Sequence, residues 1–271
     1  MLNKANLDNY KQRVIADFDS RTDYDNDFRY RSANPLVELA QLQSGQKVLD
    51  VATGTGIVAI AAAQIVGDQG KVIGVDISSG MLSQAQQKIE AASLQNIELI
   101  EADADYLNFS DHSFDVIFCS SAIPWFSDIP GVVRSWYRFL KKDGLVAFSC
   151  VAEKAYITSI VYRAVSQRNG IPMSNVNEPL GTPEKCHSLL QEAGFVNIEI
   201  KQKQFGDYIS LSDMESWWDR NLNNALGKPL LQLDSEKVEQ CKVEYMAGLE
   251  ALATHKGIWN DITTFFVLAR K

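Results

Sequence analysis

The sequence has few of the residues that build metal centres, disulfide networks or membrane spans. Its four cysteines are far apart and form no C-x-x-C pair, and its three histidines complete no metal-ligand spacing. The longest apolar run, Ile57 to Ala63, is far too short to cross a bilayer, and the first residues contain no apolar signal core. These absences predict a reduced, cytoplasmic protein without a metal site or a membrane span.

The sequence also lacks an excess of positive charge. Lysine and arginine number 26 against 34 aspartates and glutamates, so the formal net charge is −8. Because binding to a phosphate backbone needs clustered cations, a nucleic acid is not the expected partner. With 271 residues, of which 46% are hydrophobic, the chain is long enough to bury a substantial core as one domain. A homodimer is one possible assembly.

The rest of the chain is organised around the stretch from Val48 to Gly56, VLDVATGTG. Its apolar first half is typical of the end of a buried strand, and Gly54 and Gly56 permit a tight turn whose backbone can approach a ligand. The apolar run that begins at Ile57 is typical of the start of a helix. A strand, a glycine turn and a helix together present free N–H groups at the carboxyl edge of a sheet, where open α/β sheets bind nucleotides.

Around this stretch, apolar strand patterns alternate with amphipathic helix patterns. Such alternation predicts an α/β fold: a Rossmann-like, doubly wound sheet of about seven strands, mostly parallel with an antiparallel last strand, and a helical cap. The expected strands are residues 47–51, 71–76, 97–101, 114–120, 145–151, 196–203 and 262–269.

Two ligand classes compete for the glycine turn. The stretch Gly54–Ala59 fits the dinucleotide pattern G-x-G-x-x-G/A, and Asp76 stands where an NAD-binding domain has its ribose-binding acid. Tyr137 and Lys141 have the Y-x-x-x-K spacing of short-chain reductases, although such a pair is more often two neighbours on one amphipathic helix. An NAD(P)-dependent reductase is therefore the alternative enzyme.

Further acids at the same edge favour the other class. Asp50 ends the first strand, where dinucleotide folds usually have an apolar residue, and an anion there suits a bound ammonium group better than a pyrophosphate. Glu101–Ala104 adds acids at the end of the third strand. The third feature is the fourth strand, Phe114–Ser120, with Trp125 just beyond its end. Acids along one edge favour a cationic cofactor that carries no phosphate.

With these motifs the sequence resembles the class I S-adenosylmethionine-dependent methyltransferases, and within them the branch of ubiquinone and menaquinone C-methyltransferases and related small-molecule enzymes. The resemblance covers about Asp19–Val151 with specific motifs and Thr182–Lys271 more weakly. Four stretches carry it: the first-strand motif, the second-strand motif, the adenine-binding motif and the turn into the fifth strand, at Val48–Gly56, Val72–Ser78, Glu101–Ala104 and Leu140–Leu145. The cofactor that it implies is S-adenosyl-L-methionine.

The resemblance implies a role for each matching site residue. Asp50 and the turn backbone would hold the methionine part of the cofactor, and Asp76 would accept from both ribose hydroxyls. The adenine would lie on apolar side chains, with Asp103 accepting from its amino group, and Ser120 would form the floor under the sulfonium. The remaining members of the site are Ala52, Thr53, Gly54 and Gly56 in the turn, and Ile77, Met81 and Ala104 around the adenine.

The resemblance also implies one methyltransferase domain over residues 1–271. Its expected parts are an N-terminal helical lid (1–35), a cofactor-binding core (36–151), and a C-terminal half (152–271) with a helical substrate cap at about 205–258 and a last strand at 262–270. Within the lid, residues 4–18 have helical spacing, and Asn34-Pro35 has the residue types of an N-cap and a first helical position.

The expected reaction transfers a methyl group to a small aromatic or hydrophobic molecule by in-line displacement. Aromatic walls suit such an acceptor, and the candidates are Tyr24, Trp125, Trp217 and Trp218. No catalytic base is evident from the sequence. Quinone methyltransferases of this branch carry an Arg-Asn pair after the fourth strand, whereas this chain has Ser120–Trp125 there, which argues against a quinone precursor. A non-catalytic cofactor-binding homologue is the third hypothesis.

Overall fold

A seven-stranded sheet forms the centre of the structure. The structure is a computed structural model and describes residues 8–22 and 24–271. The strand order is β3-β2-β1-β4-β5-β7-β6. The strands are β1 (Lys47–Val51), β2 (Lys71–Asp76), β3 (Ile97–Glu101), β4 (Phe114–Ser120), β5 (Leu140–Val151), β6 (Val196–Ile209) and β7 (Ile258–Arg270).

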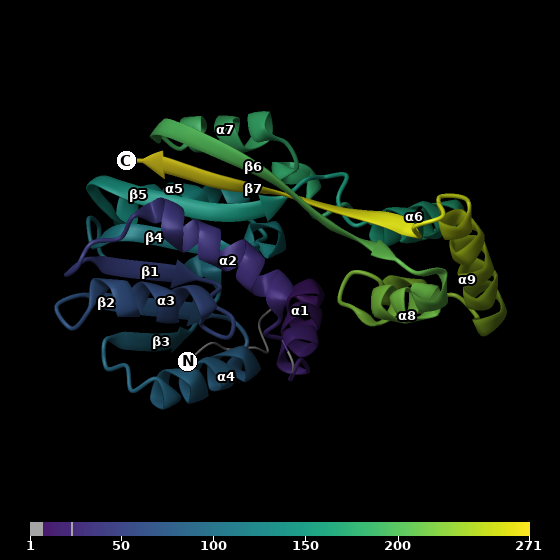
Figure 1. The fold of residues 1–271 in the computed structure, drawn as a ribbon, viewed down its shortest axis with the longest axis horizontal. Coiled ribbons are helices and arrows are strands. Elements are labelled where there is room, and N and C mark those ends of the chain that lie inside the picture. Colours follow the sequence, from purple (N-terminus) through teal and green to yellow (C-terminus); the bar gives the residue numbers. More distant parts are fainter. Residues whose placement is uncertain (1–7, 23) are drawn as a thin grey trace. The chain divides into compact units, whose positions relative to one another are not determined.

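The strand directions confirm the predicted fold class. The neighbouring pairs among β3, β2, β1, β4 and β5 are all parallel, so these five strands end at the same edge of the sheet. The arrow of β7 points the opposite way to those of β5 and β6, which makes the last strand antiparallel (Figure 1). The chain therefore has the Rossmann-like, mostly parallel sheet expected from the alternation of elements.

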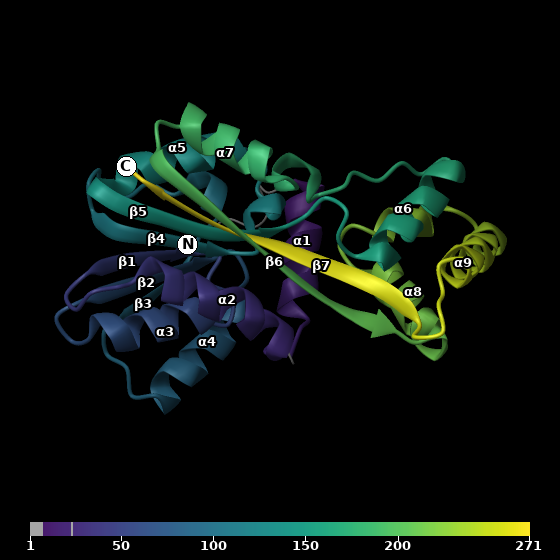
Figure 2. The same cartoon turned by 45° about the horizontal axis from the view of Figure 1, so that its top comes forward.

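Helices cover both faces of the five parallel strands. Helices α2, α3 and α4 lie on one face, and α5 and α7 lie on the other (Figure 2). The face changes because strand order reverses between β1 and β4, and right-handed crossovers then put the next helix on the opposite side. The bounds of these helices are α2 (Asp27–Ala40), α3 (Ile57–Val66), α4 (Ser79–Ala91), α5 (Ile129–Phe139) and α7 (Pro183–Glu192).

The second N-terminal helix begins earlier than the sequence analysis expects. Helix α1 spans Asn9–Asp19, capped by Asp8, whose side chain accepts from the Lys11 N–H. Helix α2 spans Asp27–Ala40 and begins at the Asn26 cap, so the prediction that Asn34 starts this helix is wrong. Pro35 lies inside the helix instead. The continuous apolar stripe of Ala33, Leu36, Val37 and Ala40, which is buried, stabilises the helix across the proline.

The predicted helical pairing of Tyr137 with Lys141 is also wrong. Helix α5 ends at Phe139 and β5 begins at Leu140, so Lys141 belongs to a strand. Its ammonium pairs with Asp115 at 2.8 Å, while the Tyr137 ring packs edge-on against Phe195 at 5.2 Å. Both side chains therefore stabilise the amino end of the sheet, and they do not form a reductase pair.

The chain divides into two compact units. The first contains residues 1–150, 182–202 and 265–271, and it holds the parallel sheet and the glycine turn. The second contains residues 151–181 and 203–264, with α6 (Ile157–Arg168), α8 (Met214–Asn223) and α9 (Ser235–Glu250). Its own core includes Tyr162, Trp218 and Tyr245. The predicted cap at about 205–258 lies wholly within this second unit, and its covering role stays a prediction.

In the part of the chain that the structure describes, no helix combines the length and the apolar composition needed to cross a bilayer.

Candidate functional site

The glycine turn after β1 is held by side chains of its own strand and the next one. Asp50 is buried at the end of β1, and one of its carboxylate oxygens accepts from Thr53 Oγ1 at 2.6 Å. Gly74 in β2 leaves the space for this threonine, because a Cβ there would lie 3.1 Å from Thr53 Oγ1. The turn has left-handed backbone at Ala52 (φ 55°), Gly54 (φ 56°) and Gly56 (φ 80°). Ala52 is the strained member, since left-handed backbone crowds its Cβ.

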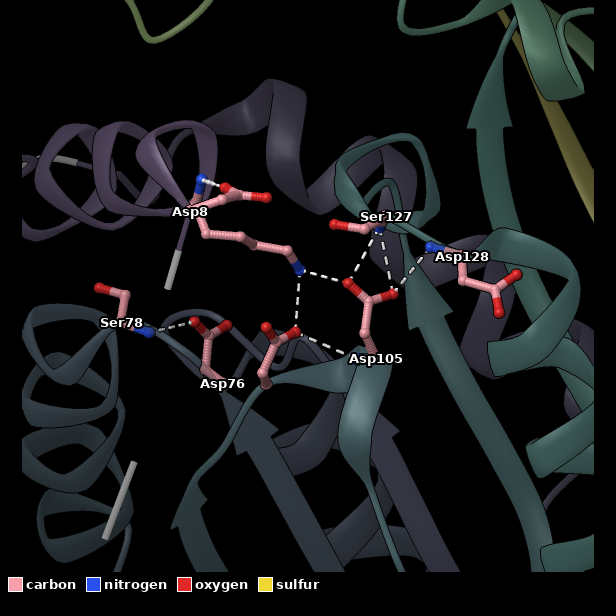
Figure 3. Close-up of polar contacts among 8 residues, drawn as sticks. Asp8, Asp76, Ser78, Asp105, Ser127 and Asp128 are labelled. Atoms are coloured by element: carbon pink, nitrogen blue, oxygen red, sulfur yellow. Dashed lines mark hydrogen bonds and ion pairs between the residues drawn. The ribbon is translucent and has the colours of Figure 1, made fainter. Parts of the chain in front are cut away.

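Asp76 joins the ends of two strands. Its carboxylate accepts from the Ser78 N–H at 2.9 Å (Figure 3). It also accepts from the Gly54 N–H at 2.8 Å, so the end of β2 is bound to the glycine turn. Asp76 is only 9% exposed. The sequence predicts Asp76 at the ligand-binding edge of the sheet, and the structure shows that its carboxylate also stabilises the glycine turn through Gly54.

Burial determines the acidity of these two carboxyl groups. Burial raises the pKa of Asp50 to about 7, and the negative charge of Asp76 adds to it against the hydrogen bond from Thr53. Burial likewise raises the pKa of Asp76 to about 6, opposed by the hydrogen bonds from Ser78 and Gly54. Both groups therefore lie in a dry environment that favours their ionised form only when a cation is near.

The acids after β3 have a different environment. Asp103 is 2% exposed, and its Oδ1 accepts from the ammonium of Lys11 at 2.8 Å and from the Asp105 N–H at 3.1 Å. Its Oδ2 is buried and has no hydrogen-bond partner among the described residues. An orphaned carboxylate oxygen is costly in a dry site, so it is a position for a donor on a bound molecule. Ala104 follows directly, as the first residue of the short helix η2 (Ala104–Tyr106).

The other predicted cofactor contacts lie on neighbouring elements. Met81 is fully buried in α4, and Ile77 is partly exposed in the turn that precedes this helix. Ser120 ends β4, and its hydroxyl lies 3.4 Å from that of Ser149 in β5. All predicted cofactor residues therefore follow or end strands at the carboxyl edge of the sheet, or lie in α4 beside it.

Two of the four predicted aromatic walls lie in one cluster. The ring of Phe18 stands edge-on to Tyr24 at 6.1 Å and to Trp125 at 5.7 Å. A Cβ on Gly54 would come 3.9 Å from Tyr24 Cε1, which puts this ring at the glycine turn. Phe18 therefore connects the two candidates.

The tryptophan pair of α8 lies in the second unit. Trp218 is 2% exposed and packs in that unit's core against Tyr162 and Tyr245, with ring centroids 5.3 and 5.4 Å away. Trp217 is partly buried against the same core, with the Arg220 guanidinium 5.0 Å from its ring centroid. Packing within this core accounts for Trp218, and a place of either ring in the acceptor pocket stays a prediction.

Three polar residues of the N-terminal segment reach the three ligand-side turns, and sequence reasoning missed them. Lys11 pairs with Asp103 after β3. Asp19 accepts from the Ser78 hydroxyl at 2.6 Å and from the Gly80 N–H at 2.9 Å at the start of α4. Asp25 accepts from the Thr55 hydroxyl in the glycine turn and from Lys88 Nζ at 2.6 Å. Lys11 and Asp19 are charged residues of an amphipathic helix and Asp25 lies in the polar stretch after it, a pattern that ordinarily indicates a solvated surface.

Comparisons with known proteins identify the family of the chain. A family model described as a methyltransferase domain matches residues 48–144, the region of β1 to β5. The aklanonic acid methyltransferase DauC of Streptomyces sp. (strain C5) is 33% identical over 159 residues, which cover 57% of this chain and 68% of that protein. The demethylmenaquinone methyltransferase of Geobacillus stearothermophilus is 32% identical over 185 residues, covering 61% and 77%.

The chain belongs to the class I S-adenosylmethionine-dependent methyltransferases. The fold agrees: a methyltransferase from Aquifex aeolicus superposes with a TM-score of 0.54 at 17% identity, over 91% of this chain and 94% of that one. At that identity the likeness shows the fold alone. The family assignment replaces the alternative of an NAD(P)-dependent reductase, which the glycine pattern by itself left open.

The site of this methyltransferase fits S-adenosylmethionine at both of its ends. The buried Asp50 has no cationic partner among the groups that set its pKa, so its charge is available to the ammonium of the methionine part. At the other end, the orphaned Oδ2 of Asp103 is an acceptor for one N–H, as the amino group of adenine provides.

Proposed function

We propose that this chain transfers the methyl group of S-adenosylmethionine to a small aromatic or hydrophobic molecule by in-line displacement. The observation that carries the proposal is the meeting of the three acids with an aromatic cluster at one sheet edge. Asp50, Asp76 and Asp103 follow or end adjacent strands, and Tyr24 lies beside Gly54 in the turn between them. Rings of this kind suit a flat or apolar acceptor and stabilise a nearby cation.

The relatives support a small-molecule acceptor of this kind. They are named for aklanonic acid and for demethylmenaquinone. The chain departs from the quinone enzymes after β4, where it has Ser120–Trp125 in place of an Arg-Asn pair. We therefore propose that the acceptor is bound by the aromatic cluster and is not a quinone precursor.

The residues of the chain have to bind the cofactor and the acceptor, orient them and exclude water. The cofactor, when bound, supplies an already activated methyl group on a sulfonium. Asp76 and the turn hold the ribose, Asp103 the base and Asp50 the methionine end, so that one face of the bound molecule is directed at the acceptor. Alignment of this sort contributes ~7–11 kcal/mol to lowering a barrier. His112 is exposed at the amino end of β4, the opposite sheet edge, so it is not a candidate base.

We propose further that the N-terminal residues 1–35 are a lid over this edge and that residues 205–258 complete the acceptor pocket. Lys11, Asp19 and Asp25 support the first part, because each holds one ligand-side turn. Hydrogen exchange tests both parts: we expect residues 8–30 and 205–258 to exchange faster than the sheet without ligand and to be protected with S-adenosylhomocysteine. Unchanged exchange in either segment contradicts its part.

Turnover and binding test the main proposal. Calorimetry with S-adenosylhomocysteine and with NADH should give binding of the first only. A panel of aromatic phenols, enols and amines, assayed for release of S-adenosylhomocysteine, should reveal an acceptor, and Asp76→Ala is the inactive control. Tight binding of the cofactor with no turnover on any acceptor would favour the non-catalytic homologue. Cys119, Cys150, Cys186 and Cys241 are buried thiols that form no disulfide with one another, which supports a reducing, cytoplasmic location.

A further inference from the structure

A buried lysine lies behind the acid that is expected to bind adenine. Lys11 is only 6% exposed, although lysine is seldom buried without a partner. It extends from α1, and its Nζ lies 2.8 Å from Asp103 Oδ1 and 2.6 Å from Asp105 Oδ2. Burial alone would lower the pKa of Lys11, but its hydrogen bonds to these two carboxylates outweigh burial and raise it. One ammonium therefore serves two buried carboxylates.

The two carboxylates are satisfied to different degrees. Asp105 also accepts from the Ser127 N–H at 2.9 Å and from the Asp128 N–H at 3.2 Å, so it fastens η2 to the loop before α5 (Figure 3). Burial acts to raise the pKa of Asp105, but the hydrogen bonds from Lys11 and Ser127 outweigh it and hold the pKa below its usual range. Asp105 is thus fully engaged within the protein.

Asp103 is engaged through one oxygen only. Lys11 and the Asp105 N–H both donate to Oδ1, and Oδ2 is left buried without a donor among the described residues. A carboxylate that is held through one oxygen by a buried ion pair cannot rotate without losing that pair. The free oxygen therefore has a fixed direction.

We propose that Lys11 is a positioning residue that determines the selectivity for the amino group of adenine, by fixing Asp103 so that only Oδ2 faces the base. The inference rests on the proposed function, since it assumes that Asp103 contacts the base. It adds a residue from outside the strand ends, 92 positions away from Asp103 in the sequence. Lys11 acts through Asp103 and does not itself contact the cofactor.

A merely structural role for Lys11 predicts something else. Helix α1 and the following segment are also held by Asp19 at Ser78 and by Asp25 at Lys88. If Lys11 only helped to hold this segment, its loss would weaken all ligands of the site alike. Lys88→Met is therefore the matched control, because it removes an ion pair between the same segment and a different element, α4.

The experiment compares two ligands that differ at the amidine edge of the base, where the 6-amino group is replaced by a carbonyl and N1 gains a hydrogen. S-adenosylhomocysteine donates from its 6-amino group, whereas S-inosylhomocysteine has a carbonyl oxygen there that a carboxylate repels. Calorimetry on the wild-type chain should show a preference of at least ~30-fold for the amino ligand, as expected for a charged hydrogen bond. In Lys11→Met we expect this ratio to fall below about 5-fold. Lys11→Arg, which can still bridge two carboxylates, should keep most of it.

The controls separate the outcomes. In Lys88→Met the affinities for both ligands should fall by the same factor, with the ratio unchanged, and Lys11→Met should raise KM for the cofactor more than it lowers kcat. An equal loss for both ligands in Lys11→Met overturns the inference, and so does tighter binding of S-adenosylhomocysteine, which would mean that Lys11 competes with the base. If Lys11→Met does not fold, Lys11→Gln replaces it in the same comparison. Failure of the wild-type chain to bind S-adenosylhomocysteine contradicts the proposed function instead.

Discussion

Two groups of buried acids lie at one sheet edge, and they differ in the charged residues beside them. Around Asp50 and Asp76, the charged groups that act on their pKa values within the described residues are other acids, and burial raises the pKa values to about 7 and about 6. The pair Asp103 and Asp105 shares the ammonium of Lys11, and the pKa of Asp105 is lowered. In the first group, Asp50 is left to be neutralised by a bound cation, whereas the second group is neutralised within the protein.

This difference matches the two ends of the cofactor. The methionine end carries an ammonium and a sulfonium, which a dry, uncompensated carboxylate attracts strongly. The adenine end is neutral, so it brings no cation that could neutralise the charge of the Asp103 and Asp105 carboxylates. Aspartates that follow adjacent strands therefore differ in role according to the cation that lies beside them. The following predictions test this difference.

The largest effect is expected from Asp76→Ala. Its carboxylate is predicted to accept from two ribose hydroxyls and is observed to hold the Gly54 and Ser78 N–H groups. At ~1.5–3 kcal/mol for each charged hydrogen bond, loss of the ribose contacts should weaken S-adenosylhomocysteine binding by about 10²–10⁴-fold. Calorimetry measures this, with circular dichroism to show that the variant is folded. A folded variant with wild-type affinity would remove Asp76 from the site.

Asp103→Ala should cost less, because a single contact to the adenine amino group is lost. We expect about a 10–100-fold loss of affinity. Asp105→Ala is the matched comparison: its carboxylate is already engaged by Lys11, Ser127 and Asp128, so its loss should lower the melting temperature more than it discriminates between ligands. If the Asp105 variant loses the preference for the amino ligand and the Asp103 variant keeps it, the adenine contact is assigned two positions too early.

The uncompensated group should make binding dependent on pH. Because the pKa values of Asp50 and Asp76 are near 7 and 6, both carboxyls are partly protonated in the free protein at mildly acid pH. A ligand ammonium favours their ionised form, so binding releases protons and affinity rises with pH. We expect roughly a tenfold gain between about pH 5.5 and 7.5. Calorimetry in buffers of different ionisation enthalpy counts the protons, and Asp50→Asn should flatten the upper part of the curve. A flat wild-type profile contradicts this.

The same two groups set the sign of the stability profile without ligand. The native carboxyls hold protons that the unfolded chain has already lost, so their contribution to stability is present below the unfolded pKa and is lost as pH rises through about 6 and 7. The melting temperature should therefore fall over this range, and less steeply in Asp50→Asn. Stability that rises through this window in the wild type but not in the variant would reverse the assignment.

The smallest effect concerns the turn between the two groups. Ala52 has a φ of 55°, which costs an alanine but not a glycine. Ala52→Gly should raise the free energy of unfolding by about 0.5–1 kcal/mol, measured by urea denaturation. Ala61→Gly in the middle of α3 is the control and should lower it by about 1 kcal/mol. Destabilisation by both substitutions would show that the Ala52 side chain contributes packing that outweighs its backbone strain.

Local sequence patterns are enough to predict the sheet and the acids that follow its strands. Val48–Gly56 is contiguous, so its strand, its turn and the position of Asp50 follow from local preferences that neighbouring residues set. Asp76 and Asp103 likewise follow from where a buried strand ends. The start of α2 was not determined in this way, because two asparagines, Asn26 and Asn34, have the residue type of a cap, and only the packing of the apolar stripe decides between them.

Only the tertiary structure decided which acid is paired with what. Lys11 and Asp103 are separated by 92 positions, and Asp25 and Thr55 by 30, so no local pattern relates them. A lysine on an amphipathic helix has the same sequence pattern whether it points to water or into the protein. Its role depends on desolvation and on the partners that folding brings within 3 Å, and both are properties of the packed molecule.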